Sequence, residues 1–257
     1  MIKILALGDV CGAPGTEYLL HGRRLSRFKG HVGADLVIVN AENSAAGNGV
    51  TPESAEALFF AGADVLTGGN HSFRRREAQS LLDDEKCILR PANYPDRAIG
   101  HGYCITECAR QRVLVINLAG CVYMEPLESP FTCADRILRE CDGKYDAAVI
   151  DIHAEATSEK IALARYLDGR VAAVFGTHTH VATADAQVLP GGTGYITDLG
   201  MCGSHAGILG VATAPILHKF LVKTPVMFTP AEGQNEIHGA LFEIRDGKCF
   251  RAESILD

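Results

Sequence analysis

The chain has 257 residues, 47% of them hydrophobic and 21% charged, which suits a globular protein with an ample core. Its formal net charge of −7 argues against a general binding surface for nucleic acid or for anionic membranes. No apolar run approaches the roughly 18 residues of a membrane span, and the N-terminus lacks the features of a signal peptide. We therefore expect a cytoplasmic protein that forms one domain over residues 1–257.

Nine cysteines are scattered along the chain, and no Cys-x-x-Cys pair occurs among them. A zinc ribbon or a thioredoxin-type redox centre is therefore not favoured, and reduced thiols are expected. Cys11 lies two residues from Asp9, a candidate metal ligand, and the sequence leaves open whether its thiol contacts a metal site.

The first part of the chain alternates predicted strands and helices, with polar residues after the strands. An apolar strand over 2–7 leads into a glycine-rich turn with Asp9, and a helix is expected over 16–29. The dinucleotide pattern Gly-x-Gly-x-x-Gly is absent from this turn, which argues against a nucleotide-cradling loop. A second strand over 36–39 is followed by Glu42 and Asn43.

The next helix has clear start signals. We expect it over 52–60, with Thr51 as the N-cap and a proline at the first helical position. A strand over 64–67 then precedes Asn70 and His71. The arginine triplet 74–76 is expected on a polar helix, either as a solvated face or as a group that steers phosphate.

The later elements deliver three histidines. Strands over 103–106 and 112–117 are expected to meet at a turn, a loop follows over 120–130, and a helix is expected over 132–140. A strand over 147–150 leads to His153, and a helix over 158–167 precedes the apolar strand 171–175, after which His178 and His180 emerge. Beyond His180 the pattern predicts strands and turns, with strands over 186–189, 194–197, 226–229, 237–244 and 249–254.

Polar residues thus follow five apolar strands, and the ligand site of an open α/β sheet lies beyond the carboxyl ends of its strands. The candidate metal ligands are Asp9, Glu42, Asn43, Asn70, His153, His178 and His180. Nitrogen and oxygen ligands without a thiolate fit Mn²⁺, Fe or Zn²⁺. Seven ligands exceed the needs of one tetrahedral ion, whereas two ions that share a carboxylate would use them all. Such a pair points to hydrolysis of phosphoesters.

These motifs resemble those of the calcineurin-like metallophosphoesterases and, more narrowly, of their YmdB-like bacterial branch. The matching stretches are Gly8-Asp9-Val10, Asn40-Ala41-Glu42-Asn43-Ser44, Gly68-Gly69-Asn70-His71, Asp151-Ile152-His153-Ala154-Glu155, Gly176-Thr177-His178-Thr179-His180 and Thr197-Asp198-Leu199-Gly200-Met201. Two positions depart from the wider superfamily. Cys11 stands where a histidine is usual, and Ala41-Glu42-Asn43 replaces the usual Gly-Asp; both are features of the narrower branch.

The resemblance implies an α/β fold, a four-layer α/β/β/α sandwich of two mixed sheets flanked by helices. It also implies two divalent transition-metal ions, Mn or Fe, with Zn or Mg as alternatives. The first would be held by Asp9, Glu42, Asn43 and His180, and the second by Glu42, Asn70, His153 and His178, with Glu42 bridging. His71 would be the general acid, a role that suits an imidazole.

The implied activity is phosphodiester hydrolysis of 2′,3′- or 3′,5′-cyclic nucleotides by a metal-bridging hydroxide. Tyr123, Tyr195 and Phe73 are candidates for stacking on a base, although ordinary packing is the simpler role for each. The expected partner is a small phosphoester, most simply a cyclic nucleotide, with no stable nucleic acid and no membrane, and a homo-oligomer is left open. Two alternatives remain: a general phosphomonoesterase with the same ligands, and a metal-containing regulatory scaffold with little turnover.

Overall fold

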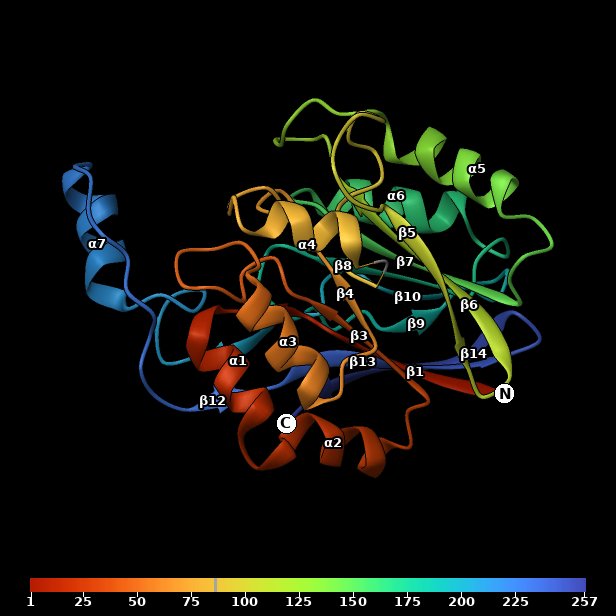
Figure 1. The fold of residues 1–257 in the computed structure, drawn as a ribbon, viewed down its shortest axis with the longest axis horizontal. Coiled ribbons are helices and arrows are strands. Elements are labelled where there is room, and N and C mark those ends of the chain that lie inside the picture. The colour runs from red at the N-terminus through yellow and green to blue at the C-terminus, as the bar shows by residue number, and fades with distance from the viewer. Residues whose placement is uncertain (86) are drawn as a thin grey trace.

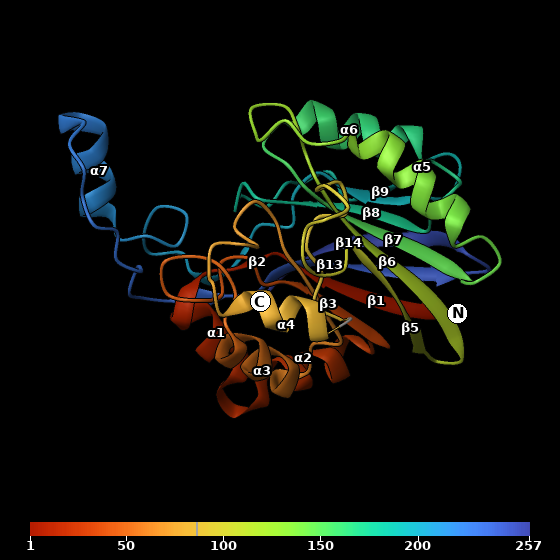
Figure 2. The same cartoon turned by 45° about the horizontal axis from the view of Figure 1, so that its top comes forward.

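The computed structural model describes residues 1–85 and 87–257, and its centre is two mixed β-sheets that stack face to face (Figures 1 and 2). The five-stranded sheet has the order β14 (Lys248–Leu256), β13 (His238–Arg245), β1 (Ile2–Leu7), β3 (Leu36–Asn40) and β4 (Val65–Thr67). The six-stranded sheet has the order β5 (Tyr103–Cys108), β6 (Gln111–Ala119), β7 (Ala147–His153), β8 (Ala173–Thr177), β10 (Gly194–Ile196) and β9 (Gln187–Val188).

Both large sheets mix parallel and antiparallel strands. In one sheet β1, β3 and β4 are parallel, while β13 and β14 add to it as an antiparallel hairpin. In the other, β6, β7, β8 and β10 are parallel, with β5 and β9 antiparallel at the two edges. The parallel strands bring their carboxyl ends to one side of each sheet, where polar side chains collect.

Helices cover the outer face of each sheet (Figure 2). On one side lie α1 (Gly12–Leu20), α2 (Arg24–Val32), α3 (Pro52–Ala61) and α4 (Ala78–Asp84), and on the other α5 (Pro130–Glu140) and α6 (Thr157–Tyr166). Because strand side chains alternate between faces, Ile2 and Ile4 pack between the sheets, whereas Leu5 and Leu7 pack under the helices. The predicted four-layer α/β/β/α sandwich is confirmed.

A third, small sheet was not expected from the sequence. It has the order β12 (Asn235–Glu236), β11 (Met201–Ser204) and β2 (Asp9–Val10), and its strands have two to four residues each. Runs this short carry no periodicity that a sequence pattern can detect. Its effect is to attach the segment after residue 200 directly to the strand that carries Asp9.

Two predicted helices have different bounds in the structure. The helix expected over 16–29 is wrong: α1 and α2 are separate, because Gly22 and Arg23 take the left-handed conformation, with φ of 58° and 56°. The arginine triplet lies before α4 in turns rather than on a helix, and Arg75 Nε donates to Asn48 O at 3.0 Å. In contrast, Thr51 caps α3 as predicted.

The region beyond His180 contains a helix that the pattern did not predict. This helix, α7 (Thr213–Val222), buries none of its side chains and projects away from the sandwich (Figure 1). The strand expected over 226–229 is not formed, and Met227 in it is 85% exposed. The helix was missed and the strand was wrongly predicted because the apolar residues of this region are exposed. Hydrophobicity here therefore does not indicate which residues are buried. In the described part of the chain, no helix is long and apolar enough to cross a membrane.

Candidate metal centre

The eight predicted site residues gather at the carboxyl ends of strands from both large sheets and β2. Asp9 lies in β2 and His153 is the last residue of β7, while the other six lie in the loops after β3, β4 and β8. Asp9, Glu42 and His153 are almost completely buried, with 0–1% exposure. A site assembled from strands far apart in sequence has therefore formed, with its anionic groups removed from water.

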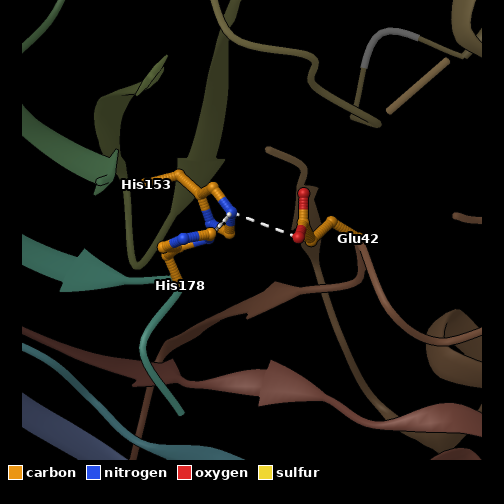
Figure 3. A group of neighbouring side chains, drawn as sticks. All are labelled: Glu42, His153 and His178. Carbon is orange, nitrogen blue, oxygen red and sulfur yellow. Dashed lines mark hydrogen bonds and ion pairs between the residues drawn. The ribbon is translucent and has the colours of Figure 1, made fainter. Parts of the chain in front are cut away.

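Glu42 lies at the middle of this group. Its Oε1 is 3.0 Å from His71 Nδ1 and 3.1 Å from His153 Nε2, and its Oε2 accepts from the His71 backbone N–H at 2.9 Å. Figure 3 shows the Glu42 carboxylate facing the paired rings of His153 and His178. Asn43 Nδ2 also donates to Glu42 Oε1 at 3.2 Å, so His71, His153 and Asn43 all contact this one carboxylate.

One half of the site surrounds His153 Nε2 with more acceptors than hydrogen bonding can satisfy. Glu42 Oε1, Asn70 Oδ1 and His178 Nδ1 each lie 3.1 Å from this nitrogen. An imidazole nitrogen carries at most one proton and donates it to one acceptor well. Nitrogen and oxygen atoms that converge in this way fit a divalent transition-metal ion bound between them.

The other half contains Asp9, Asn43 and His180. The Asn43 carboxamide nitrogen is 3.4 Å from Asp9 Oδ1 and 3.2 Å from His180 Nε2, and His180 Nε2 is 3.6 Å from Asp9 Oδ1. A half-turn of the terminal torsion exchanges the nitrogen and oxygen of a carboxamide, so Asn43 can present an oxygen ligand to the same groups. These residues also fit a cation.

The charges of the site shift its pKa values in opposite directions. Burial by itself would raise the pKa values of the Asp9 and Glu42 carboxyl groups. The nearby imidazoles have the larger, opposite effect, so that His180 lowers the pKa of Asp9 and His153 lowers the pKa of Glu42. Burial by itself would lower the pKa of His153, but the charge of Glu42 raises this pKa to about 9. In the same way, Asp9 raises the pKa of His180 well above its normal value. Carboxylates that stay ionised while buried are what a cation site requires.

A buried hydrogen-bond network beneath the site orients its ligands. His153 Nδ1 lies 2.9 Å from Thr177 Oγ1, which donates to Asp151 Oδ1 at 2.7 Å, and Asn40 Nδ2 donates to Asp151 Oδ2 at 3.1 Å. With Nδ1 engaged, Nε2 is the nitrogen that faces Glu42. Burial raises the pKa of Asp151 to about 6. Sequence reasoning missed this network, although its members lie in the motifs that carry the ligands.

The loop with His178 and His180 has a strained backbone. Their φ angles are 100° and 63°, in the left-handed region that non-glycine residues avoid. Two carboxylates stabilise the loop: Asp9 Oδ2 accepts from the His178 N–H at 3.0 Å, and Asp198 Oδ2 accepts from the Thr179 N–H at 3.1 Å. Asp198 is in turn paired with Lys160 at 2.7 Å, and both side chains are at most 1% exposed.

We expect Asp198→Asn to lower the free energy of unfolding by about 3–5 kcal/mol, because it leaves the buried ammonium group of Lys160 without a counter-charge. Denaturant titration would measure the change. Asp146→Asn is the matched control, since its partner Arg112 is exposed, and it should have a much smaller effect. Equal effects of the two substitutions would contradict this role for the buried pair.

Cys11 and Glu155 contact the outer nitrogens of the loop histidines. Cys11 Sγ lies 3.5 Å from His180 Nδ1, while His180 Nε2 is the nitrogen that faces Asp9. Glu155 Oε2 lies 3.1 Å from His178 Nε2. Cys11 therefore orients the candidate ligand His180 through Nδ1. The contact of Glu155 with His178 was not predicted from the sequence.

The three aromatic candidates for base stacking have different environments. Tyr195 is 2% exposed and its hydroxyl bonds Thr197 Oγ1 at 2.8 Å, so its ring packs in the core, which is the role that the sequence favoured, and is not available to a base. Phe73 packs edge-on against Tyr94, with ring centroids 5.2 Å apart. Tyr123 is 90% exposed, on the loop between β6 and α5.

Comparison with known proteins extends the likeness to nearly the whole chain. The model of the family described as "YmdB-like protein" matches residues 5–255. A Bacillus subtilis (strain 168) protein named 2′,3′-cyclic-nucleotide 2′-phosphodiesterase is 41% identical, with 99% of this chain and 97% of that protein covered.

Two solved structures have closely similar folds. A hypothetical protein from Thermus thermophilus superposes with a TM-score of 0.92 at 38% identity, covering 99% of this chain and 98% of the other. A Mycoplasma pneumoniae protein described as a novel phosphatase also gives a TM-score of 0.92, at 32% identity, covering 100% of this chain and 93% of the other.

Proposed function

The chain belongs to the family of YmdB-like proteins, and on that premise we propose that it is a metal-dependent phosphodiesterase that hydrolyses 2′,3′-cyclic nucleotides. The observation that carries the proposal is the convergence of buried carboxylates, imidazoles and amides on Glu42, with His71 at the edge of the group. The name of the Bacillus subtilis relative supports the choice of the 2′,3′-cyclic substrate over the 3′,5′-cyclic one.

The residues divide into two ligand sets that share Glu42. We assign the first ion to Asp9, Glu42, Asn43 and His180, and the second to Glu42, Asn70, His153 and His178. Mn or Fe is the proposed metal, since the donor set contains nitrogen and oxygen but no thiolate. When bound, such ions supply positive charge to the phosphoryl group and lower the pKa of water.

His71 is placed to handle the proton of the leaving group. Its Nδ1 contacts Glu42 Oε1 at 3.0 Å, which orients the ring and leaves Nε2 for substrate. Its side chain is 28% exposed, so a phosphoester can reach it. In the proposed reaction water loses a proton to solvent and adds to phosphorus, and the bond from phosphorus to O2′ breaks. His71 donates a proton to O2′ and then regains one from solvent. The product is a 3′-phosphomonoester.

We expect metal affinity to rise with pH up to about pH 9. At pH values below their raised pKa values, the rings of His153 and His180 each carry an additional proton. A metal ion that binds these rings must displace those protons, so its affinity falls as the pH falls. Calorimetric titration of the metal-free protein with Mn²⁺ in buffers of different ionisation enthalpy would count the protons released. An affinity that stays constant between about pH 6 and pH 8 would contradict this coupling.

The function is tested by substrate comparison. The Mn²⁺-loaded protein and the same protein after chelation are assayed with 2′,3′-cAMP, 3′,5′-cAMP and a simple phosphomonoester. We expect turnover of 2′,3′-cAMP to exceed that of the others and to vanish on chelation. Preference for the monoester would favour the phosphomonoesterase alternative, and absence of any turnover in the Mn²⁺-loaded protein would favour the scaffold.

A further inference from the structure

A second group of metal-ligating side chains lies where residues 206–233 leave the sandwich. This segment, the arm, contains α7, which buries no side chain and projects from the body (Figure 1). The chain enters the arm after His205 and leaves it at Gln234, and the His205 N–H donates to Gln234 O at 3.2 Å. The neighbouring pairs Gly203–Glu236 and Ser204–Asn235 complete a short two-stranded neck.

His205, Glu236 and His238 face one another at this neck. One ligand atom from each lies within 4.8 Å of the other two. The imidazole rings of His205 and His238 are 4.2 Å apart between centroids, and His238 Nε2 is 2.9 Å from Glu236 Oε2. None of the three belongs to the ligand sets assigned around Glu42.

His238 meets this group through one of its two ring nitrogens. The residue is buried, with 8% exposure, and its Nε2 faces Glu236 Oε2. Its Nδ1 packs against Gly200, where an added Cβ would lie 2.7 Å away, so Nε2 is the nitrogen that His238 offers to an ion. His205 Nε2 lies 3.5 Å from Met201 O, which is at the long limit of a hydrogen bond and holds the ring only weakly.

We propose that His205, Glu236 and His238 bind a Zn²⁺ ion that clamps the neck of the arm. Two imidazoles and one carboxylate are a ligand set that zinc takes in tetrahedral sites, with water in the fourth position. Ligand atoms around such an ion are about 3.4 Å apart, so small side-chain rotations suffice to close the group.

The clamp would connect the arm to the centre around Glu42. Leu209, near the start of the arm, has its carbonyl oxygen 3.3 Å from His180 Nδ1. Gly210 lies beside Cys11, where an added Cβ would meet the Cys11 Cβ at 3.0 Å. Zinc bound at the neck would therefore fix the start of the arm, which contacts His180, a proposed ligand of the catalytic metal. The zinc itself would take no part in the reaction.

The test uses zinc alone as the probe and needs no turnover. The metal-free protein is treated with diethyl pyrocarbonate with and without Zn²⁺, and modified histidines are mapped by peptide mass spectrometry. We expect Zn²⁺ to lower modification of His205 several-fold. His218 in α7 is the internal control, because it is exposed and bonds only Thr224 among its described contacts, and its modification should not change.

Two variants locate the ion. His205→Ala and Glu236→Gln should each bind one zinc fewer per chain than the native protein, whereas His218→Ala should keep the native count. Glu236→Gln changes few atoms and should also abolish the zinc protection of His205. Equal zinc counts in the native protein and Glu236→Gln, or protection that persists in that variant, would overturn the assignment.

Discussion

Gly69→Ala is expected to abolish metal binding at the centre and to lower turnover by about 100-fold or more. A Cβ at Gly69 would lie 2.2 Å from Glu42 Oε2 and 2.3 Å from His153 Nε2, far inside van der Waals contact. Both side chains are buried and hydrogen-bonded, so neither can move without losing its partners. Metal analysis after dialysis, together with kcat for 2′,3′-cAMP, measures the effect.

Gly30→Ala is the matched control for this substitution. Gly30 lies inside α2, and an added Cβ there would meet no atom within 4 Å. Because alanine favours helix over glycine, we expect unchanged metal content and a stability gain of up to about 1 kcal/mol. If Gly69→Ala kept its metal and its turnover as Gly30→Ala does, the positions assigned to Glu42 and His153 would be wrong.

His71→Ala should lower kcat for 2′,3′-cAMP by about two to four orders of magnitude while the metal content stays at the native level. The loss should depend on the leaving group. A sugar alkoxide leaves poorly without a proton, whereas nitrophenolate needs little help, so bis(p-nitrophenyl) phosphate should lose far less. Comparing the two substrates separates proton donation from a merely structural role of His71.

His101→Ala provides a control for the removal of an imidazole. His101 contacts Asp83 O at 3.3 Å and none of the residues around Glu42 among its described hydrogen bonds. It should retain native turnover of both substrates. Equal losses for His71→Ala on both substrates, or loss of its metal, would contradict the assignment of His71 as general acid.

The ends of the main strands could be predicted from the sequence because each strand is a continuous apolar run. The polar residues that follow these runs could be predicted for the same reason. The ends of β3, β7 and β8 are examples, and the side chains after them fall within one site. Two-residue strands such as β2 and β12 were not predictable, since no periodicity exists over so few residues.

The network beneath the site was also beyond the sequence argument. Asn40, Asp151 and Thr177 precede the ligands by one or two positions, and their role depends on meeting across two sheets. Pattern reasoning places a residue on a strand but does not say which buried polar groups will pair. The same limit applies to Lys160, whose helical position gave no sign of its buried partner Asp198.

Anomalous diffraction from crystals of the Mn²⁺-loaded protein would locate the ions of the proposed dinuclear centre. We expect two peaks about 3.5–4 Å apart, one on each side of the Glu42 carboxylate. His153 and His178 should contact one peak, and Asp9 and His180 the other. A single peak, or peaks that Glu42 does not bridge, would contradict the dinuclear centre.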